Sequence, residues 1–314
     1  GWAGPSAFMS TLAALGLAFA TAAPAEVIVT VDDNTAHADI TLTNGAGQTY
    51  SAEATIVFDA PQNLSPESLN VTAEIVDPAD INPRLPQEPI ANALLCPGGP
   101  VAMDPDFPVM ITVEPPATPW LFETGFDGGA ASGGLGFLNT YSFEIHTHDL
   151  FYEPHSRYRV FKAPIGENFL DITNAVEAGS VRARGRHGAF SQFVIAKDLR
   201  GQHGLLGVNV LCGVYAEKTT ALTGYVLGAL IGDVLRLDLL RLLAKIVALI
   251  PIDVLGALSA VEELIATIDA NAGTDLPNAW HASHDVTNSA GEMKGVAEAL
   301  RFDLQESLDS SAKP

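Results

Sequence analysis

The clearest group of side chains that could do chemistry lies in Glu144, His146 and His148, with Glu153 a short distance downstream. Successive side chains of a β-strand point to opposite faces, so Glu144, His146 and His148 are expected on one face, with Phe143 on the other. Two imidazoles and a carboxylate can hold Zn²⁺ or another transition metal and leave one position open for water. The sequence therefore indicates a candidate metal site formed by His146, His148 and Glu153. The alternative is an exposed strand face whose histidines make ordinary surface hydrogen bonds.

The spacing of these three residues resembles the metal-binding motif of cupin barrels, in which His-x-His is followed after four residues by Glu. A Pro-x-Gly comes next in that motif, and Pro164-Ile-Gly166 is present here. The sequence departs from the motif at three places: Thr140 and Val160 stand where the motif has glycines, and Phe169 lies near the place of its last histidine. The resemblance implies a metal-dependent oxidase, isomerase or lyase as one alternative function.

A second group is the strip formed by Arg182, Arg184 and Arg186. The alternation of a strand places these three guanidinium groups on one face. Arg pairs with carboxylate, sulfate and phosphate through two parallel hydrogen bonds, so the strip could bind an anionic glycan. The alternative is internal, because the strip could pair with the acidic N-terminal half of the same chain.

The charge of the chain supports this internal alternative. Its 314 residues hold 16 Lys and Arg against 37 Asp and Glu, a net charge of −21. Residues 1–150 contain one base, Arg84, and carry −17, whereas residues 151–250 carry +4 and residues 251–314 carry −8. Binding to nucleic acid is driven by bases that neutralise phosphates, so we expect no nucleic-acid partner.

The elements that position these groups are predicted from hydrophobic periodicity. Apolar and polar residues alternate in 27–32, 38–43, 52–59 and 70–77, and again in 137–150, 158–163 and 180–198. The spacing of the first four runs predicts an immunoglobulin-like antiparallel sandwich, followed by a second β section. A Pro-rich connection at 78–107 lies between them.

The C-terminal third predicts helices at 219–250, at 252–270 and at about 286–308. The last has Met293, Val296, Ala297, Leu300 and Leu304 on one stripe. The longest uncharged stretch, at 219–232, is shorter than the ~20 apolar residues that a membrane span needs. The sequence thus predicts an α+β protein with a β-sandwich region at 26–200 and a helical domain at 201–314.

The N-terminus has the pattern of a signal peptide, expected at 1–25. An apolar run at 11–20 is followed by Ala20-Thr21-Ala22 and Ala23-Pro24-Ala25, which fit signal peptidase. Export would permit a disulfide between Cys96 and Cys212, the two cysteines of the chain; two separate buried thiols are the alternative.

Several stretches together resemble a family of secreted bacterial proteins of unknown function. They are 108–116 (PVMITVEPP), 140–150 (TYSFEIHTHDL), 158–164 (YRVFKAP), 171–200 and 273–302. The last helices also resemble the helical hairpin found beside the β domains of many exported bacterial proteins. The resemblance implies export and architecture, with no activity attached.

From these observations we expect an exported protein (periplasm, cell surface or extracellular) that acts as an interaction or structural module. We expect no catalytic residue, no cofactor and no membrane span after signal removal. Its partner is not indicated by the sequence, with another envelope protein or a glycan as candidates. The metal-dependent enzyme and the anionic-glycan binder stay as alternatives.

Overall fold

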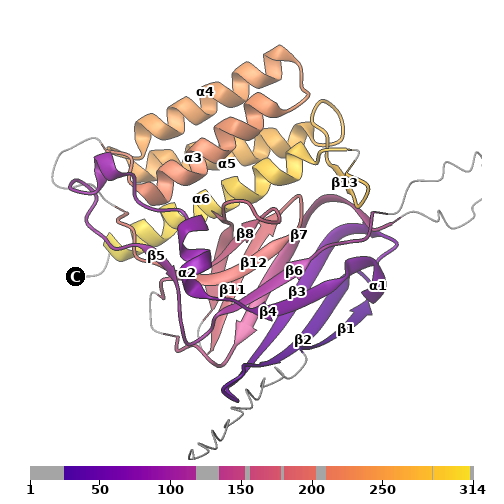
Figure 1. Cartoon of the computed structure of the whole chain (residues 1–314). Helices are drawn as coiled ribbons and strands as arrows, with labels where there is room; N and C mark the ends of the chain where they lie inside the picture. Colours follow the sequence, from indigo (N-terminus) through magenta and orange to yellow (C-terminus); the bar gives the residue numbers. More distant parts are fainter. Residues whose placement is uncertain are drawn as a thin grey trace, which may run out of the picture.

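The computed structural model of the chain describes residues 25–117, 134–152, 156–177, 180–202, 210–284 and 286–311. The expected signal peptide, apart from Ala25, and the candidate metal ligand Glu153 lie outside these residues. The described residues form an α+β protein with two antiparallel sheets and C-terminal helices (Figure 1).

The first sheet has seven strands within the described residues, in the order β1-β2-β3-β7-β11-β10, with β13 paired to β7. They are β1 (Glu26–Asp32), β2 (Thr35–Thr43), β3 (Thr49–Gln62), β7 (Gly136–Thr147), β11 (Val181–His187), β10 (Thr173–Glu177) and β13 (Ala279–His281).

The second sheet has six strands within the same residues, in the order β4-β6-β12-β8-β9, with β5 paired to β12. They are β4 (Val71–Ile75), β5 (Val101–Met103), β6 (Val109–Val113), β8 (Tyr158–Ala163), β9 (Leu170–Asp171) and β12 (Gln192–Asp198).

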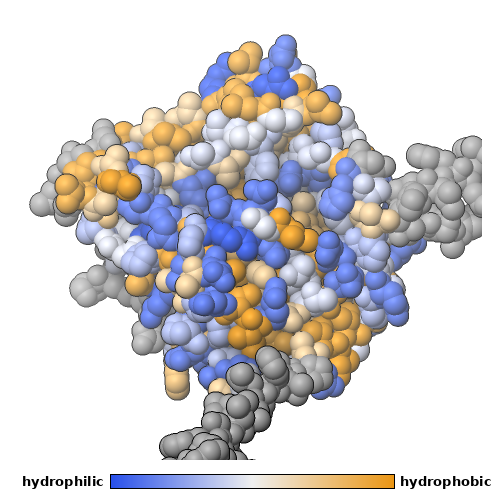
Figure 2. All heavy atoms as spheres, viewed as in Figure 1, coloured by the Kyte–Doolittle hydropathy of each residue, from blue (hydrophilic) through white to orange (hydrophobic). Residues whose placement is uncertain are grey.

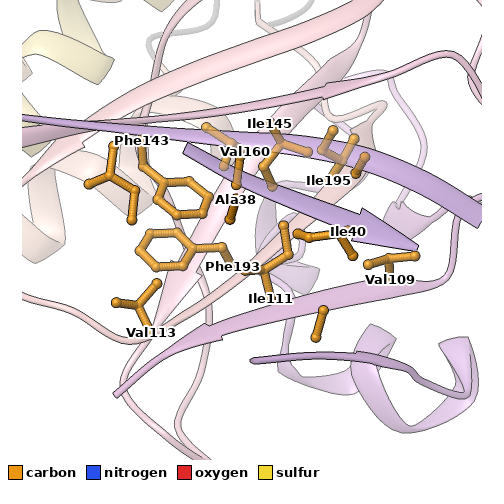
Figure 3. Close-up of a cluster of buried hydrophobic side chains, with 14 of the residues drawn as sticks. Ala38, Ile40, Val109, Ile111, Val113, Phe143, Ile145, Val160, Phe193 and Ile195 are labelled. Carbon is orange, nitrogen blue, oxygen red and sulfur yellow. The ribbon is translucent and has the colours of Figure 1, made fainter. Parts of the chain in front are cut away.

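The predicted strands are confirmed, and their alternation places the core. Ile40 and Leu42 on β2 are buried, as are Phe143 and Ile145 on β7. These side chains meet apolar residues of the second sheet, and the ring of Phe143 stacks on that of Phe193 with centroids 3.8 Å apart (Figure 3). The two sheets therefore pack face to face around a shared apolar core.

The runs expected as an N-terminal sandwich and as a second β section share their sheets. Strand β3 pairs with β7, and β6 pairs with β12, so both sections contribute to both sheets. The structure does not confirm an immunoglobulin-like arrangement. Hydrophobic periodicity shows which face of a strand is buried but not which strand lies next to it.

The 78–107 connection crosses the outer face of the second sheet. It contains α2 (Pro78–Ile81), two short 3₁₀ turns (Asn82–Arg84 and Ile90–Asn92) and β5. Ile81 and Leu85 pack there on Phe161 and Val194. A four-residue helix, α1 (Pro66–Leu69), joins β3 to β4.

The helical layer consists of α3 (Gly213–Gly228), α4 (Asp233–Leu249), α5 (Val254–Asn271) and α6 (Ser289–Ser311). Helix α6 lies on β11, β10 and β7, while α3 and α5 pack on α6, and α4 packs on α3 and α5 (Figure 1). The predicted apolar stripe of α6 is buried from Met293 to Leu304. No helix among the described residues is long and apolar enough to cross a membrane.

The single helix predicted over 219–250 is wrong, because the chain leaves helical geometry at Ala229 and re-enters it after Gly232. Gly228 and Gly232 lie at this break, and glycine disfavours a continuous helix. Apolar side chains of this segment are exposed, since Leu230 is 89% exposed and Val234 is 78% exposed. Figure 2 shows apolar residues over the helical layer at the top of the view.

Candidate functional site

His146 lies on the outer face of the first sheet, as the alternation predicted, but both of its ring nitrogens already have oxygen partners. Nδ1 lies 3.1 Å from Glu53 Oε2, and Nε2 lies 2.5 Å from Ser180 Oγ. The ring of His148 contacts that of His146 edge to face, with centroids 4.7 Å apart. The sheet thus brings the two imidazoles together and gives His146 a hydrogen-bonding role.

Within the described part of the chain, no group of three or more His, Cys, Asp or Glu side chains could hold a metal ion. The third expected ligand, Glu153, lies outside that part. The metal site at His146, His148 and Glu153 therefore stays a prediction.

The arginine strip lies on β11, with its side chains facing carboxylates. Glu144 Oε1 lies 3.6 Å from Arg182 Nε, and its other carboxylate oxygen lies 4.0 Å from Arg184 Nη1. Arg186 lies 3.6 Å from Asp59 and 4.0 Å from Glu298 of α6. Glu144 and Asp59 belong to the acidic first 150 residues, so the internal pairing weighed in the sequence analysis is present. The arginines are 32–42% exposed, and pairs of this kind contribute about 0–1 kcal/mol each.

Cys96 and Cys212 form a disulfide, with a sequence separation of 116. The bond attaches the 78–107 connection to the start of α3. Both carboxylate oxygens of Glu88 accept hydrogen bonds from the Gly213 N–H at the same place.

A cavity of about 370 Å³ lies where the packed sheets meet the first turn of α6. Its walls come from the ends of β6 and β8, the turn between β11 and β12, β13 and α6. The lining residues are Val113, Glu114, Pro115, Lys162, Pro164, Ile165, Ala189, Phe190, Ser191, Trp280, His284 and Glu292. Its volume falls in the range of small-molecule sites, and aromatic walls with a few polar groups are typical of them.

Lys162 extends the core-facing row of β8 into this cavity. It lies on the same face of the strand as Tyr158 and Val160, which belong to the core between the sheets. The residue is 4% exposed. Among the described residues its amine has no hydrogen-bond or ion-pair partner.

The other described lysines each have a partner. Lys218 and Lys294 pair with Asp171 and Asp269, and Lys245 pairs with Glu263, while Lys197 faces the ring of Tyr158. A buried lysine without a partner is costly, since burial penalises its charged form. Such a residue facing a cavity is a candidate functional group.

Burial shifts the pKa values of the ionisable groups in and beside the cavity. Burial lowers the pKa of Lys162 to about 8, although Glu292 acts to raise it. Burial raises the pKa of Glu292, which Lys162 acts to lower. Burial, with the charge of Lys162 second, lowers the pKa of the neighbouring His187 well below its usual range. His187 is therefore neutral near pH 7, and its Nδ1 accepts a hydrogen bond from the Ala189 N–H.

Two glycines of α6 bring Glu292 to the cavity. A Cβ at Gly291 would lie 2.0 Å from the Asn139 carbonyl oxygen, and one at Gly295 would lie 2.3 Å from that of Arg186. The helix backbone can therefore touch β7 and β11 directly. The Asn288 side chain fixes the start of the helix, because its Oδ1 accepts from the Gly291 N–H and its Nδ2 donates to the Asn139 carbonyl.

Ring–ring contacts hold Trp280 in the aromatic wall of the cavity. Trp280 of β13 stacks on Phe137 at 5.2 Å and contacts Phe190 edge to face at 5.3 Å. His284 contacts the edge of Trp280 at 5.5 Å. Its φ of 55° lies in the left-handed region, which costs a residue with a side chain about 1 kcal/mol or more.

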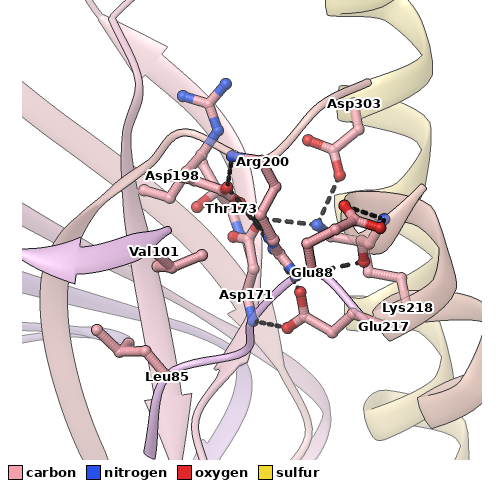
Figure 4. Close-up of polar contacts among 12 residues, drawn as sticks. Leu85, Glu88, Val101, Asp171, Thr173, Asp198, Arg200, Glu217, Lys218 and Asp303 are labelled. Carbon is pink, nitrogen blue, oxygen red and sulfur yellow. Dashed lines mark hydrogen bonds and ion pairs between the residues drawn. The ribbon is translucent and has the colours of Figure 1, made fainter. Parts of the chain in front are cut away.

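A second buried charged group, which contains several ion pairs, lies between β9, α3 and α6 (Figure 4). Lys218 Nζ lies 2.6 Å from Asp171 Oδ2 and 2.5 Å from Asp303 Oδ2. Arg200 pairs with Asp198 at 2.6 Å and with Glu217 at 2.7 Å. No cavity described above opens onto these residues, so we assign them a structural role in docking the helices on the sheets.

The cavity and both of its charged groups, Lys162 and Glu292, were not predicted from the sequence. Lys162 lies in YRVFKA, a strand whose apolar residues fall on both faces, so a lysine in it has no exposed face to occupy. That signal was present in the sequence. For Glu292 the sequence contains no such signal, because an acidic residue in the first turn of a helix is common.

The fold and this site define the chain as an α+β protein of two antiparallel sheets and C-terminal helices, with a small-molecule-sized cavity where they meet. The chain belongs to a family of unknown function, DUF6689, whose family model matches residues 11–307. The expectation of a family without assigned activity is confirmed. No curated protein and no solved structure matches the chain.

Proposed function

We propose that the protein binds a small organic acid in the cavity between the sheets and α6, with the ligand's carboxylate on Lys162. The observation that carries this proposal is the unpartnered, buried amine of Lys162 in a cavity walled by Phe190 and Trp280. A ligand carboxylate would give the amine the direct ion-pair partner that Glu292 does not, and an aromatic or aliphatic body would cover the rings.

Benzoate is a suitable probe, and titration calorimetry measures its binding. We expect one molecule bound per chain, with affinity that falls as the pH rises past about 8, because Lys162 then loses its proton. Lys162→Met should weaken binding at least about tenfold, the lower range for a charge-assisted hydrogen bond. Lys197→Met, which changes an exposed lysine on the neighbouring strand, is the matched control. Equal affinity of the two variants would contradict the proposal.

We further infer that the protein works outside the cytoplasm as a binding module. The Cys96–Cys212 bond supports this, because disulfides persist in oxidising compartments, and so does the apolar run at 11–20 with its small-x-small ending. Expression of the sequence in a bacterium, with fractionation and N-terminal sequencing, tests the inference. We expect an oxidised protein outside the cytoplasm that begins near residue 23 or 26. An unprocessed, reduced protein in the cytoplasm would contradict it.

The two alternative functions from the sequence have less support. The ring nitrogens of His146 already contact Glu53 and Ser180, which disfavours metal-dependent chemistry there. The strip of Arg182, Arg184 and Arg186 faces carboxylates, which disfavours an anionic-glycan site.

A further inference from the structure

The amine of Lys162 differs from the other described lysines in its environment. It is held by a strand inside the protein, it faces a cavity, and neither a carboxylate nor a ring partners it. A lysine of this kind can act as a nucleophile, because burial without a partner favours the uncharged amine. With a pKa of about 8 against the usual 10.5, its uncharged fraction near neutral pH is roughly three-hundredfold larger than that of an exposed lysine.

A carboxyl group that can move protons faces the same cavity. Glu292 lies at the first turn of α6, and its pKa is raised by burial and influenced by Lys162. Imine formation needs an amine that attacks a carbonyl carbon and an acid that protonates the departing oxygen. The cavity supplies both groups and places an aromatic wall beside them.

We propose that Lys162 captures an aldehyde-bearing ligand as a covalent imine, with Glu292 as the proton donor and acceptor. This inference rests on the proposed function in that it uses the same cavity, and it extends the ligand class from organic acids to small aldehydes.

The reaction is a condensation without change of oxidation state. The lone pair of the Lys162 nitrogen forms a bond to the carbonyl carbon, the carboxyl group of Glu292 donates its proton to the carbonyl oxygen, and the resulting carboxylate takes one proton from the nitrogen. The resulting hydroxyl leaves as water with a proton from Glu292. The nitrogen then forms a double bond to carbon and returns its last proton to the Glu292 carboxylate, so one aldehyde and one amine yield one imine and one water.

Benzaldehyde with cyanoborohydride at about pH 7.5 tests the proposal, because the reductant converts an imine into a stable benzylamine that peptide mapping by mass spectrometry locates. We expect Lys162 to be labelled at least ten times faster than the exposed Lys245, and benzoate to slow the labelling. Lys162→Arg keeps the positive charge but lacks a primary amine, so it should lose the label.

The outcomes separate the two proposals. Labelling of Lys162 no faster than that of Lys245, in a protein that binds benzoate, overturns imine capture and leaves organic-acid binding in place. Fast labelling without benzoate binding supports imine capture and contradicts the organic-acid class. Absence of both contradicts the two together. The native protein with and without benzoate gives the answer even if the Arg variant does not fold.

Discussion

Lys162 shows how one residue can be costly to the fold and useful to a site. Its folded pKa of about 8 lies below the value near 10.5 expected in the unfolded chain. The folded state therefore binds the proton less tightly, so the cost to stability is fully present below about pH 8. It disappears as the pH rises from about 8 to about 10.5.

For this residue we predict that the Lys162→Met variant has a larger free energy of unfolding than the native protein at pH 7. The pH-dependent part of this advantage should be about 3 kcal/mol, the equivalent of the pKa difference, and should vanish by about pH 10.5. Urea unfolding of both proteins across this pH range measures it. A difference that stays constant with pH would show that Lys162 is not held in a buried environment.

At the scale of elements, the contact of α6 with the first sheet places Glu292. Gly291 and Gly295 let the helix backbone approach β7 and β11 without an intervening side chain. Ordinary helix propensity would favour alanine at either position. The advantage of glycine at these two positions therefore comes from the close contact with the neighbouring strands and not from the helix itself.

We predict that Gly295→Ala destabilises the protein by about 1–3 kcal/mol, since its Cβ would collide with the Arg186 carbonyl and the helix would have to move. Gly224→Ala in α3 is the matched control, because a Cβ there meets nothing within 4 Å. It should stabilise the protein by about 0.5–1 kcal/mol. Chemical denaturation compares the two, and equal signs would refute the close-contact argument.

At the scale of the whole molecule, buried charge joins the helical layer to the sheets. Lys218 of α3 lies between Asp171, at the end of β9, and Asp303 of α6. Burial has the largest influence on the pKa of each of these three groups. At Lys218 the two carboxylates more than offset it, so the pKa of Lys218 is raised. Asp303 keeps a pKa raised to about 7, because burial outweighs its attraction to Lys218.

We predict that Lys218→Met costs about 3–5 kcal/mol at pH 7, because it removes the cation that pairs with the buried carboxylates of Asp171 and Asp303. Lys245→Met, which removes an exposed pair with Glu263, should cost no more than about 1 kcal/mol. Unfolding midpoints of the two variants measure the contrast. Similar losses would mean that the buried group does not dock the helices.

The sequence by itself determined the α+β class, the strand faces and the buried stripe of α6, because periods of 2 and 3.6 residues are local properties. The sheet pairing of β3 with β7 and the exposure of Leu230 were decided by the tertiary structure. The same holds for the candidate site. Lys162 and Glu292 are far apart in the chain. They face one cavity because the sheets form one of its walls and α6 forms another. Burial and the lack of a partner make such groups reactive, and both depend on what the rest of the fold brings near them.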